Sequence, residues 1–318
     1  MKNILVIGAA GQIGSELVPE LRRRGYMTVA AGSGRTPLPA SLAEGGPTAV
    51  VNLLDAEGVR KTVEHFSIDT VFNLAAILSA VGESKPMTAW DIGVNGVIGL
   101  LELACDKKLS VFTPSSIGVF GPETPHDPTP QDTVCRPRTM YGITKVAGEL
   151  LSDYYRAKYG VDARSVRYPG LISHVTPPGG GTTDYAVDIY WKAVENRCYA
   201  SPLAEGTKLP MMFMADALRA AIELMEADAS RLRHFNSFNV GAMSFAPEEI
   251  AASIRRRMPG FELSYEVNPL LQRIAESWPD ALDDTAAREE WNWKPEYDLD
   301  AMTDVMLNAV AQRLGKTL

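Results

Sequence analysis

The chain begins with an apolar segment that runs directly into a glycine-rich turn, and few folds start in this way. Residues 4–7 are continuously apolar, and glycines follow at positions 8, 11 and 14 as a helical pattern begins. In such a turn one glycine permits the bend, one lets the backbone approach a pyrophosphate, and one lets the helix pack on the strand. The free N–H groups that start the helix add a partial positive charge. A plain glycine-rich turn is the alternative, but the preceding strand favours a phosphate-binding loop made of Gly8, Gly11, Gln12, Ile13 and Gly14.

Short apolar segments alternate with helical patterns along the first 170 residues. Strands that are apolar throughout and separated by helices imply a parallel sheet covered on both faces. The predicted fold class is therefore α/β, a doubly wound parallel sheet of the Rossmann type with a smaller C-terminal substrate lobe. We predict strands at 2–7, 28–31, 49–53, 70–73, 110–113 and 162–167, and helices at 11–24, 56–65, 87–107 and 141–159.

This alternation weakens beyond residue 171, which suggests a change of domain. The segment 175–183 contains Pro-Pro-Gly-Gly-Gly and is predicted to be a loop. We expect residues 1–171 to form the dinucleotide-binding domain and residues 172–318 to form mainly the substrate lobe. Part of the second region, about 211–241, is expected to return to the main sheet.

The composition argues against several classes of function. The 318 residues include 31 Lys+Arg and 39 Asp+Glu, and the net charge of −8 is unfavourable for non-specific nucleic-acid binding. Cys105, Cys135 and Cys198 are odd in number and far apart, which suggests reduced thiols in a cytoplasmic protein. The four histidines are scattered, so no metal site is expected. No 18-residue apolar segment stands out, so no membrane span is expected.

A tyrosine and a lysine four positions apart are candidates for acid–base catalysis. Tyr141 and Lys145 share one face of a predicted helix. A tyrosine of pKa about 10 is a poor base near neutrality, but a nearby ammonium favours its phenolate. An exposed pair on a surface helix is the alternative. Ser115 and Ser116 favour the catalytic interpretation, because they follow a predicted parallel strand at the edge where ligands bind. We predict Ser116, Tyr141 and Lys145 as catalytic residues.

These motifs together resemble the extended short-chain dehydrogenase/reductase family. They are the glycine loop, Ser-Ser-x-x-x-Phe-Gly at 115–121 and Tyr-x-x-x-Lys at 141–145. Longer segments are similar to the short-chain type of L-threonine 3-dehydrogenases in that family, and the resemblance spans almost the whole chain. These segments are residues 73–80, 167–173, 177–187, 209–212 and 277–288.

The resemblance implies oxidation of the threonine 3-hydroxyl by NAD, which gives 2-amino-3-ketobutyrate. Ser116 and Tyr141 would hold the hydroxyl, and Tyr141 would take its proton as general base while a hydride leaves for the nicotinamide. Lys145 would bind the nicotinamide ribose and favour the phenolate.

The resemblance also assigns residues to the dinucleotide. Most would line its path or border the adenine. Asn95 is expected either near the nicotinamide or in a helix-bending role. Ser33 is a departure, because members of this group usually carry Asp there. Ser33 could hydrogen-bond a ribose hydroxyl and Arg35 could stack on adenine or pair with a 2′-phosphate, so NAD is expected and NADP stays open. The set also includes Asn52, Leu53, Leu74, Ala75, Ala76, Tyr168 and Leu171.

An α-amino acid substrate brings a carboxylate, and successive backbone N–H groups in a glycine-rich loop can bind an anion. Residues 179–181, with Gly180 at the centre, and the hydroxyls of Thr182 and Thr183 are candidates for this contact. Ser79 and Ser115 are hydroxyl-bearing candidates on the opposite rim.

Two other functions fit the same motifs. One is a nucleotide-sugar epimerase or reductase on this scaffold, and the other is a non-catalytic dinucleotide sensor. A sensor needs the glycine loop but neither Tyr141 nor Lys145. The helices at 87–107 and 141–159 resemble the pair that forms a dimer interface in the family, so we expect a homodimer.

Overall fold

The computed structural model describes residues 1–77, 79–176 and 181–318, without the side chains of residues 79–81. The described chain divides into two compact units. Unit 1 comprises Met1–Val119, Pro137–Arg167 and Leu218–Phe238. Unit 2 comprises Phe120–Arg136, Tyr168–Ala217 and Asn239–Leu318.

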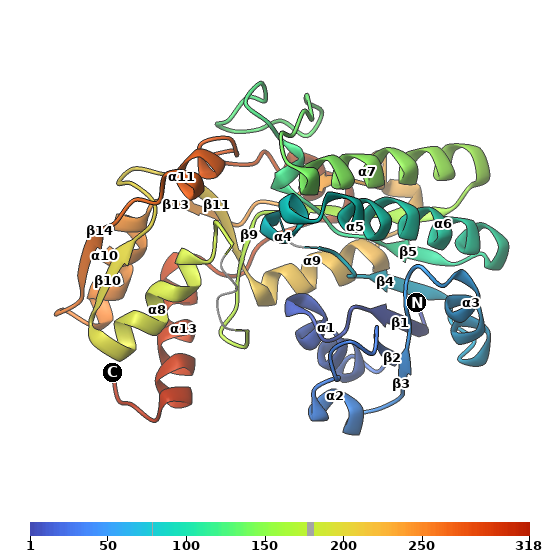
Figure 1. Ribbon diagram of the computed structural model, residues 1–318, viewed down its shortest axis with the longest axis horizontal. Coiled ribbons are helices and arrows are strands. Elements are labelled where there is room, and N and C mark those ends of the chain that lie inside the picture. The colour runs from blue at the N-terminus through green and yellow to red at the C-terminus, as the bar shows by residue number, and fades with distance from the viewer. Residues whose placement is uncertain (78, 177–180) are drawn as a thin grey trace. The chain divides into compact units, whose positions relative to one another are not determined.

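A six-stranded sheet forms the centre of unit 1 (Figure 1). Its strand order is β3-β2-β1-β4-β5-β7, and each neighbouring pair is parallel. From β1 the chain adds β2 and β3 toward one edge of the sheet, and then returns to add β4, β5 and β7 toward the other edge. This order is that of a doubly wound dinucleotide-binding sheet. The predicted fold class is confirmed. The strands are β1 (Asn3–Ile7), β2 (Met27–Gly32), β3 (Thr48–Val50), β4 (Thr70–Asn73), β5 (Ser110–Phe112) and β7 (Asp162–Arg164).

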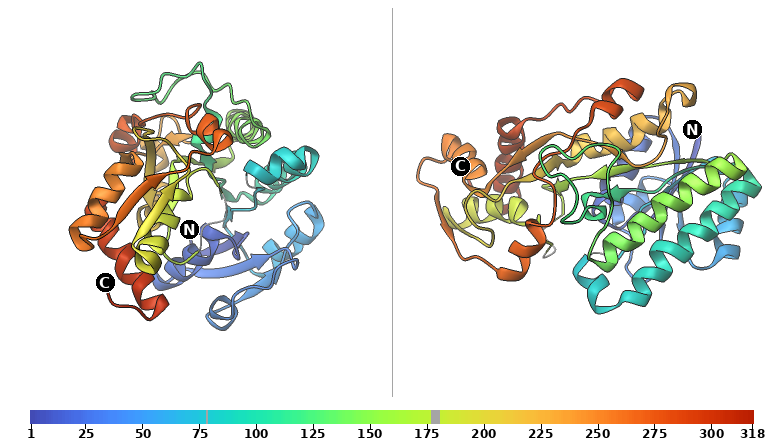
Figure 2. Two further views of the ribbon diagram at one scale, coloured as in Figure 1. Left: turned by 60° about the vertical axis from the view of Figure 1, so that its left-hand side comes forward. Right: turned by 90° about the horizontal axis from the view of Figure 1, so that it is seen from above.

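Helices cover both faces of this sheet. On one face, α3 (Ala56–His65), α6 (Gly96–Lys107) and α7 (Met140–Tyr159) share an apolar core with alternate residues of the strands. On the other face, α1 (Gln12–Arg23) lies beside the second half of α9 (Met214–Glu226), where the Tyr26 hydroxyl donates to Glu226 at 2.5 Å (Figure 2). The shorter elements of unit 1 are α2 (Ala40–Glu44), α4 (Ser79–Ser84), η2 (Ile117–Val119) and η3 (Ala229–Arg231).

The helix predicted at 87–107 consists of three consecutive segments. They are α5 (Pro86–Trp90), a π-helical turn η1 (Asp91–Asn95) and α6. By length and composition alone the run Pro86–Lys107 could cross a membrane, contrary to the expectation from the sequence. Its residues Val97, Leu100 and Leu101, however, lie in the core of unit 1. Packing of a core helix therefore accounts for its hydropathy.

The strand predicted at 162–167 is interrupted at Ser165. The Ser165 hydroxyl donates to Asn236 Oδ1 at 2.5 Å and accepts from the Ser237 N–H at 2.8 Å. These bonds turn the chain from β7 into β8 (Val166–Tyr168). β8 lies between β6 (Ser115–Ser116) and β12 (Phe238–Asn239) in a separate small sheet.

Unit 2 contains two small sheets and its own core. One sheet has the order β13-β11-β9, and β10 pairs with β14 in the other. Helices α8, α10 and α13 contribute most of the apolar residues of the core. The elements are β9 (Gly170–Ile172), α8 (Tyr185–Asn196), β10 (Cys198–Ser201), β11 (Leu209–Phe213), β13 (Met243–Phe245), α10 (Pro247–Arg257), β14 (Glu262–Tyr265), α11 (Pro269–Ala275), α12 (Thr285–Trp291) and α13 (Leu299–Leu314).

The unit boundaries differ from the predicted domains of 1–171 and 172–318. Residues 120–136 belong to unit 2, because the Thr129 N–H donates to Ala281 O at 2.9 Å and the Asn239 amide donates to Thr129 O at 3.2 Å. Residues 168–171 also belong to unit 2. Of the segment 211–241, only residues 218–238 belong to unit 1, because β11 pairs with β9 and β13. These pairings join distant parts of the sequence, so hydrophobic periodicity does not reveal them.

Candidate active site

The loop between β1 and α1 leaves little room for a side chain at its three glycine positions. Gly8 has a φ of +85°, and a methyl group there would lie 2.9 Å from the Leu74 carbonyl carbon. A methyl group at Gly14 would lie 2.4 Å from Gly8 O, and one at Gly11 would lie 3.3 Å from the same oxygen. No side chain caps the N-terminus of α1, whose N-cap residue is Gly11. The loop therefore presents bare backbone next to free helix N–H groups, which fits the pyrophosphate of a dinucleotide.

The end of β2 lies beside this loop, since the N–H groups of Gly8 and Ala9 both donate to Ala31 O at 3.0 Å. Ser33 and Arg35 follow β2 and are exposed. The Arg35 N–H donates to Ser33 Oγ at 3.4 Å. Both side chains are therefore accessible to a ribose or a phosphate.

The other predicted dinucleotide residues of unit 1 follow β3 and β4 at the same sheet edge. The Leu74 N–H donates to Ile7 O at 2.9 Å, which places residues 74–76 beside the glycine loop. Asn52 is exposed, and its side chain accepts from the Leu54 N–H at 3.2 Å. Leu53 is buried, and a methyl group at Gly96 would lie 2.8 Å from its Cδ2. Its side chain thus packs on α6.

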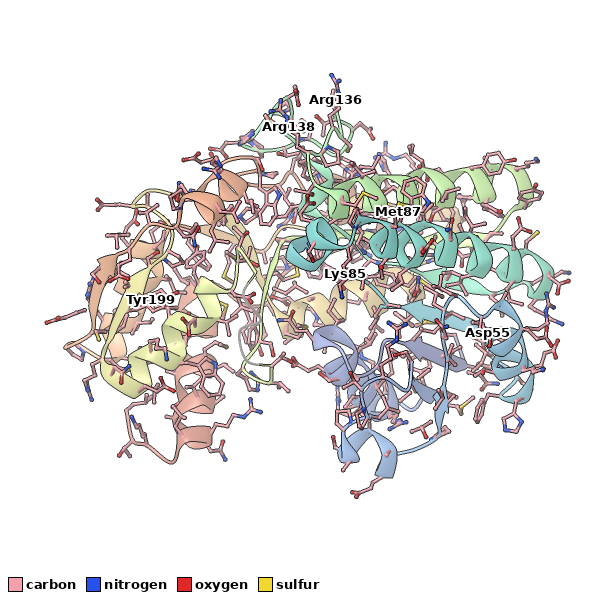
Figure 3. The ribbon with its side chains drawn as sticks, in the orientation of Figure 1. Asp55, Lys85, Met87, Arg136, Arg138 and Tyr199 are labelled. Carbon is pink, nitrogen blue, oxygen red and sulfur yellow. The ribbon has the colours of Figure 1, made fainter. Side chains whose placement is uncertain are left out.

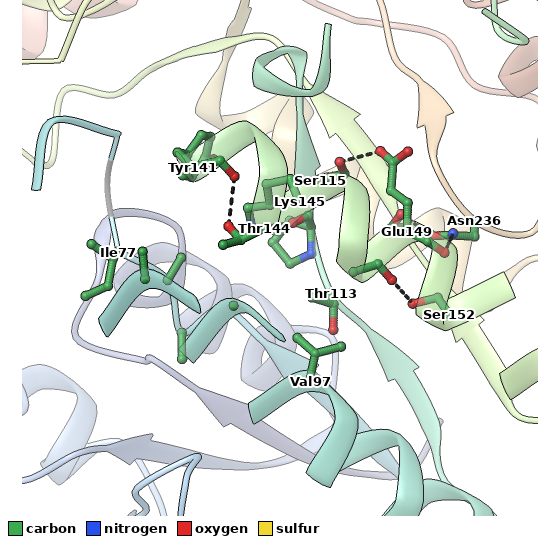
Figure 4. Close-up of a pocket in the computed structure, with 17 residues that line it drawn as sticks. Ile77, Val97, Thr113, Ser115, Tyr141, Thr144, Lys145, Glu149, Ser152 and Asn236 are labelled. Carbon is green, nitrogen blue, oxygen red and sulfur yellow. Dashed lines mark hydrogen bonds between the residues drawn. The ribbon is translucent and has the colours of Figure 1, made fainter. Parts of the chain in front are cut away.

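Tyr141 and Lys145 lie in the first two turns of α7, which Thr139 caps through its side chain. The Lys145 ammonium donates to Pro114 O at 2.7 Å and lies 5.6 Å from the centre of the Tyr141 ring. Tyr141 and Lys145 therefore lie on one face of α7, as predicted, with the ammonium near the phenol (Figure 4). The bond to Pro114 O fixes the position of the ammonium.

Ser116 and Tyr141 meet at Gly118. A methyl group on Gly118 would lie 3.0 Å from two ring carbons of Tyr141 and 3.5 Å from Ser116 Oγ. The Gly118 N–H donates to Ser116 Oγ at 3.1 Å. The three predicted catalytic residues are therefore brought together within unit 1, and the glycine at 118 allows their close approach.

A pocket in unit 1 is lined by Tyr141 and Lys145 of this group. Figure 4 shows Tyr141 at one end and Glu149 and Asn236 at the other, with Lys145 between them. The lining residues from the predicted dinucleotide path are Ala75 and Ala76. The remaining lining residues are Ile77, Ala89, Gly93, Val97, Thr113, Pro114, Ser115, Thr144, Gly148, Ser152 and Ser165.

The predicted substrate contact of Ser115 stays a prediction, although Ser115 does line the pocket. Ser115 is buried, and its hydroxyl donates to Glu149 Oε1 at 2.5 Å. Successive residues of a strand point to opposite faces, and of the two serines Ser115 is the one that lines the pocket with Tyr141 and Lys145. The side chain of Ser79 and the whole of Gly180 are outside the described residues. Thr182 and Thr183 belong to unit 2, where Thr182 is buried and Thr183 packs against Gly170.

Three further residues predicted to bind the cofactor lie in different parts of the structure. The Tyr168 hydroxyl is buried, which raises its pKa, and it donates to Ala217 O at 2.6 Å. Its hydroxyl is therefore engaged inside unit 2, and the predicted cofactor contact of Tyr168 stays a prediction. Leu171 lies in β9 of unit 2 and pairs with Met212. Asn95 lies in the π-helical turn and donates to Asp91 at 2.9 Å, which favours the helix-bending alternative.

Glu149 was missed by the sequence reasoning. It lies one helical turn beyond Lys145, lines the pocket, and forms a buried ion pair with Arg167. Its position, eight residues after Tyr141, repeats the spacing of the Tyr–Lys pair, so the signal was present in the sequence. Asn236, which donates to Glu149 O at 2.9 Å, gave no such signal.

The fold and the site define a class of protein: a doubly wound enzyme that binds a nicotinamide dinucleotide and places a tyrosine, a lysine and a serine around one pocket. A model of the NAD dependent epimerase/dehydratase family matches residues 4–241. The chain belongs to this family.

Several proteins are similar to this chain along its whole length. An uncharacterized epimerase/dehydratase of Staphylococcus saprophyticus is 50% identical, over 98% of this chain and 97% of its own. The structure of an L-threonine dehydrogenase from Clostridium difficile is 51% identical, covers 98% of both chains and has a TM-score of 0.95. A monomeric L-threonine 3-dehydrogenase from a metagenome is 40% identical, covers 98% of this chain and 100% of its own, and has a TM-score of 0.90. The resemblance expected from the sequence motifs is confirmed.

Proposed function

We propose that this protein oxidises the 3-hydroxyl of L-threonine to a ketone, giving 2-amino-3-ketobutyrate, with NAD as the oxidant and Tyr141 as the general base. The observation that carries the proposal is the convergence of Ser116, Tyr141 and Lys145 around Gly118 and Pro114. The whole-length similarity to L-threonine dehydrogenases supports the choice of substrate.

The roles of the residues follow from their positions. The bound oxidised nicotinamide supplies a hydride acceptor. Ser116 Oγ, held by the Gly118 N–H, positions the substrate hydroxyl next to the phenol of Tyr141. Tyr141 takes the hydroxyl proton, and the Lys145 ammonium, fixed on Pro114 O, favours the anionic form of the phenol that can do so.

The glycine loop fits a pyrophosphate whichever nicotinamide dinucleotide binds. We propose NAD on the resemblance to the L-threonine dehydrogenases. Ser33 gives a ribose hydroxyl a partner but carries no charge against a 2′-phosphate, and Arg35 is exposed beside it. Parallel assays with NAD and NADP test the choice.

One assay separates the proposed activity from the alternatives. The protein is incubated with NAD or NADP and with L-threonine, L-allo-threonine, L-serine or a uridine-diphosphate sugar, and the absorbance of reduced nicotinamide is followed. We expect reduced cofactor to accumulate with L-threonine. Conversion of the sugar without net reduction would identify an epimerase, and dinucleotide binding without any turnover would identify a sensor. Either result would overturn the proposal.

We also propose that the protein is a homodimer. Apolar side chains are exposed along α7, where Leu150 is 64% exposed and Tyr154 49%. On α5, Met87 is 66% exposed (Figure 3). Burial of such a surface stabilises an interface. Light scattering should give twice the mass of one chain for the wild type and a single chain for Leu150→Asp. The mass of one chain for the wild type would contradict the proposal and match the monomeric relative.

We propose a cytoplasmic location and a role in threonine breakdown. Among the described residues Cys105, Cys135 and Cys198 form no disulfide, which suits a reducing compartment. Cell fractionation with an antibody tests the location, and a secreted or membrane-bound pool would contradict it. Growth of a deletion strain on threonine tests the role.

A further inference from the structure

Side chains at three successive turns of α7 contact the strand end that carries Ser116. The ring of Tyr141 packs on Gly118, the ammonium of Lys145 bonds Pro114 O, and the carboxylate of Glu149 accepts from Ser115 Oγ. Residues at i, i+4 and i+8 share one helix face, so these contacts fix the register of α7 on this strand end. Glu149 contributes to that register, although the proposed chemistry does not use it.

The carboxylate of Glu149 is buried and is paired with a cation. Arg167 donates from Nε to Oε1 at 2.9 Å and from Nη2 to Oε2 at 2.8 Å, and both side chains are only 8% exposed. Two parallel bonds of this kind hold a guanidinium and a carboxylate in a fixed geometry. A buried ion pair is a weak source of stability, because desolvation of both charges offsets their attraction. Stability alone therefore does not account for this ion pair beside the pocket.

Glu149 of the ion pair follows Lys145 along α7, so the charge state of the pair affects the Lys145 ammonium. A buried carboxylate without Arg167 would be one helical turn from the Lys145 ammonium and would attract it. Opposite charges one helical turn apart interact more strongly in the protein interior than in water. The ammonium would then be drawn toward Glu149 and away from Pro114 O and the Tyr141 ring. Arg167 neutralises the carboxylate and removes this competition.

Other charged groups that face this part of α7 have partners of their own. Glu83 of α4 accepts from the Met140 N–H at 2.7 Å, and Asp91 of η1 accepts from Asn95 at 2.9 Å. Glu102 of α6 accepts from the Tyr155 hydroxyl.

On α7 itself, Asp153 accepts from the Asn236 amide at 3.1 Å. Burial raises the pKa of Asp153, the bond from Asn236 opposes this, and the charge of Glu149 raises it further while Arg167 and Arg156 lower it. Arg167 is thus the cation of β8 that the structure places directly on the Glu149 carboxylate.

We infer that Glu149 and Arg167 are positioning residues that form a neutral clamp: the pair holds α7 to the strand end of Ser116 and leaves the Lys145 ammonium to act on Tyr141. The inference rests on the proposed function only in naming the reaction that the clamp serves. Neither residue needs to touch the substrate or the dinucleotide.

The test follows the ionisation of Tyr141 in the protein alone. The ultraviolet absorbance of tyrosinate is titrated with pH in each variant and in the same variant with Tyr141→Phe, and the difference isolates Tyr141. Arg167→Met leaves an uncompensated carboxylate and should move the midpoint to higher pH by about one unit, which is a tenfold loss of phenolate at a given pH. Glu149→Gln leaves an uncompensated cation and should move it to lower pH. The double variant should return it to the wild-type position.

A matched control separates positioning from folding. Arg164→Met removes another buried arginine of unit 1, which does not line the pocket and whose partners are Asp162 at 2.7 Å and the carbonyl oxygens of Leu224 and Ala227. It should lower the melting temperature without moving the tyrosinate midpoint. If Arg167→Met does not fold, the shift to lower pH in Glu149→Gln still decides the question. Equal midpoints in wild type and both single variants, or shifts of the same sign, would overturn the clamp.

Turnover provides the second readout and keeps the two proposals distinct. Arg167→Met should lower kcat about tenfold or more with L-threonine, shift the activity profile to higher pH and change KM little. If the wild type does not oxidise L-threonine at all, the proposed function fails, while the tyrosinate titration still confirms or refutes the clamp.

Discussion

Substitution of Gly14 by alanine probes the phosphate loop most directly. A methyl group there would lie 2.4 Å from Gly8 O, 2.7 Å from Ala9 Cα and 3.0 Å from the Ala9 carbonyl carbon. All three are backbone atoms, so no side chain can rotate away. Ordinary contact needs about 3.5 Å, and the start of α1 must therefore withdraw from the loop by about 1 Å.

The expected cost follows from that displacement. Overpacking of this kind destabilises by about 1–3 kcal/mol, and each kcal/mol lowers the melting temperature of a domain of this size by about 2–4 °C. The helix N–H groups move with the helix, so the pyrophosphate loses their geometry as well. A loss of about 1.4 kcal/mol of binding free energy corresponds to a tenfold higher dissociation constant. We expect the dissociation constant for NAD to rise at least tenfold.

Titration calorimetry with NAD and thermal melting measure both effects. Gly11→Ala would meet one backbone oxygen at 3.3 Å and should show a smaller loss of affinity. Gly260→Ala adds a methyl group with nothing within 4 Å and serves as the control. An unchanged NAD dissociation constant in folded Gly14→Ala would refute the assignment of this loop to the pyrophosphate.

Two further predictions concern stability and cofactor choice. Asp69 accepts from the N–H groups of Lys2 and Asn3 and from the Thr70 hydroxyl, and although burial alone would raise its pKa, these bonds hold it below the usual value. A carboxylate with a lowered pKa stabilises the fold above its unfolded pKa of about 3.9, and this contribution is lost as the pH falls through the folded value. Asp69→Asn should therefore melt a few degrees lower than wild type at pH 7, with a smaller difference near pH 3, and equal melting temperatures at pH 7 would contradict this. Ser33→Asp places a carboxylate where it accepts ribose hydroxyls and repels a 2′-phosphate, so the ratio of kcat/KM for NAD over NADP should rise about tenfold or more; a fall in that ratio would exclude this position from the ribose site.

Local patterns predicted much of unit 1. The strand at 70–73 and the helix at 56–65 have the predicted bounds, because apolar continuity and helical periodicity are properties of a few neighbouring residues. The glycine spacing placed the loop correctly between β1 and α1. The Tyr–Lys spacing likewise put two functional groups on one face of α7.

Features that depend on distant pairings were not predictable in this way. Ser165 interrupts a strand because Asn236 and Ser237 bond to it from 71 and 72 residues away. Residues 120–136 join unit 2 through Thr129 and its bonds near Ala281. The orientation of Ser115 toward Glu149 depends on the register of α7, which no spacing within the strand reveals.

In the proposed reaction Tyr141 takes the proton of the substrate hydroxyl. The most direct test of this step is the steady-state kcat for L-threonine oxidation by Tyr141→Phe, with the NAD dissociation constant measured on the same preparation. Loss of a general base typically costs about 10²–10⁴-fold in rate, so we predict a fall of that size with NAD affinity retained within a few-fold. A kcat within about threefold of wild type would contradict the account.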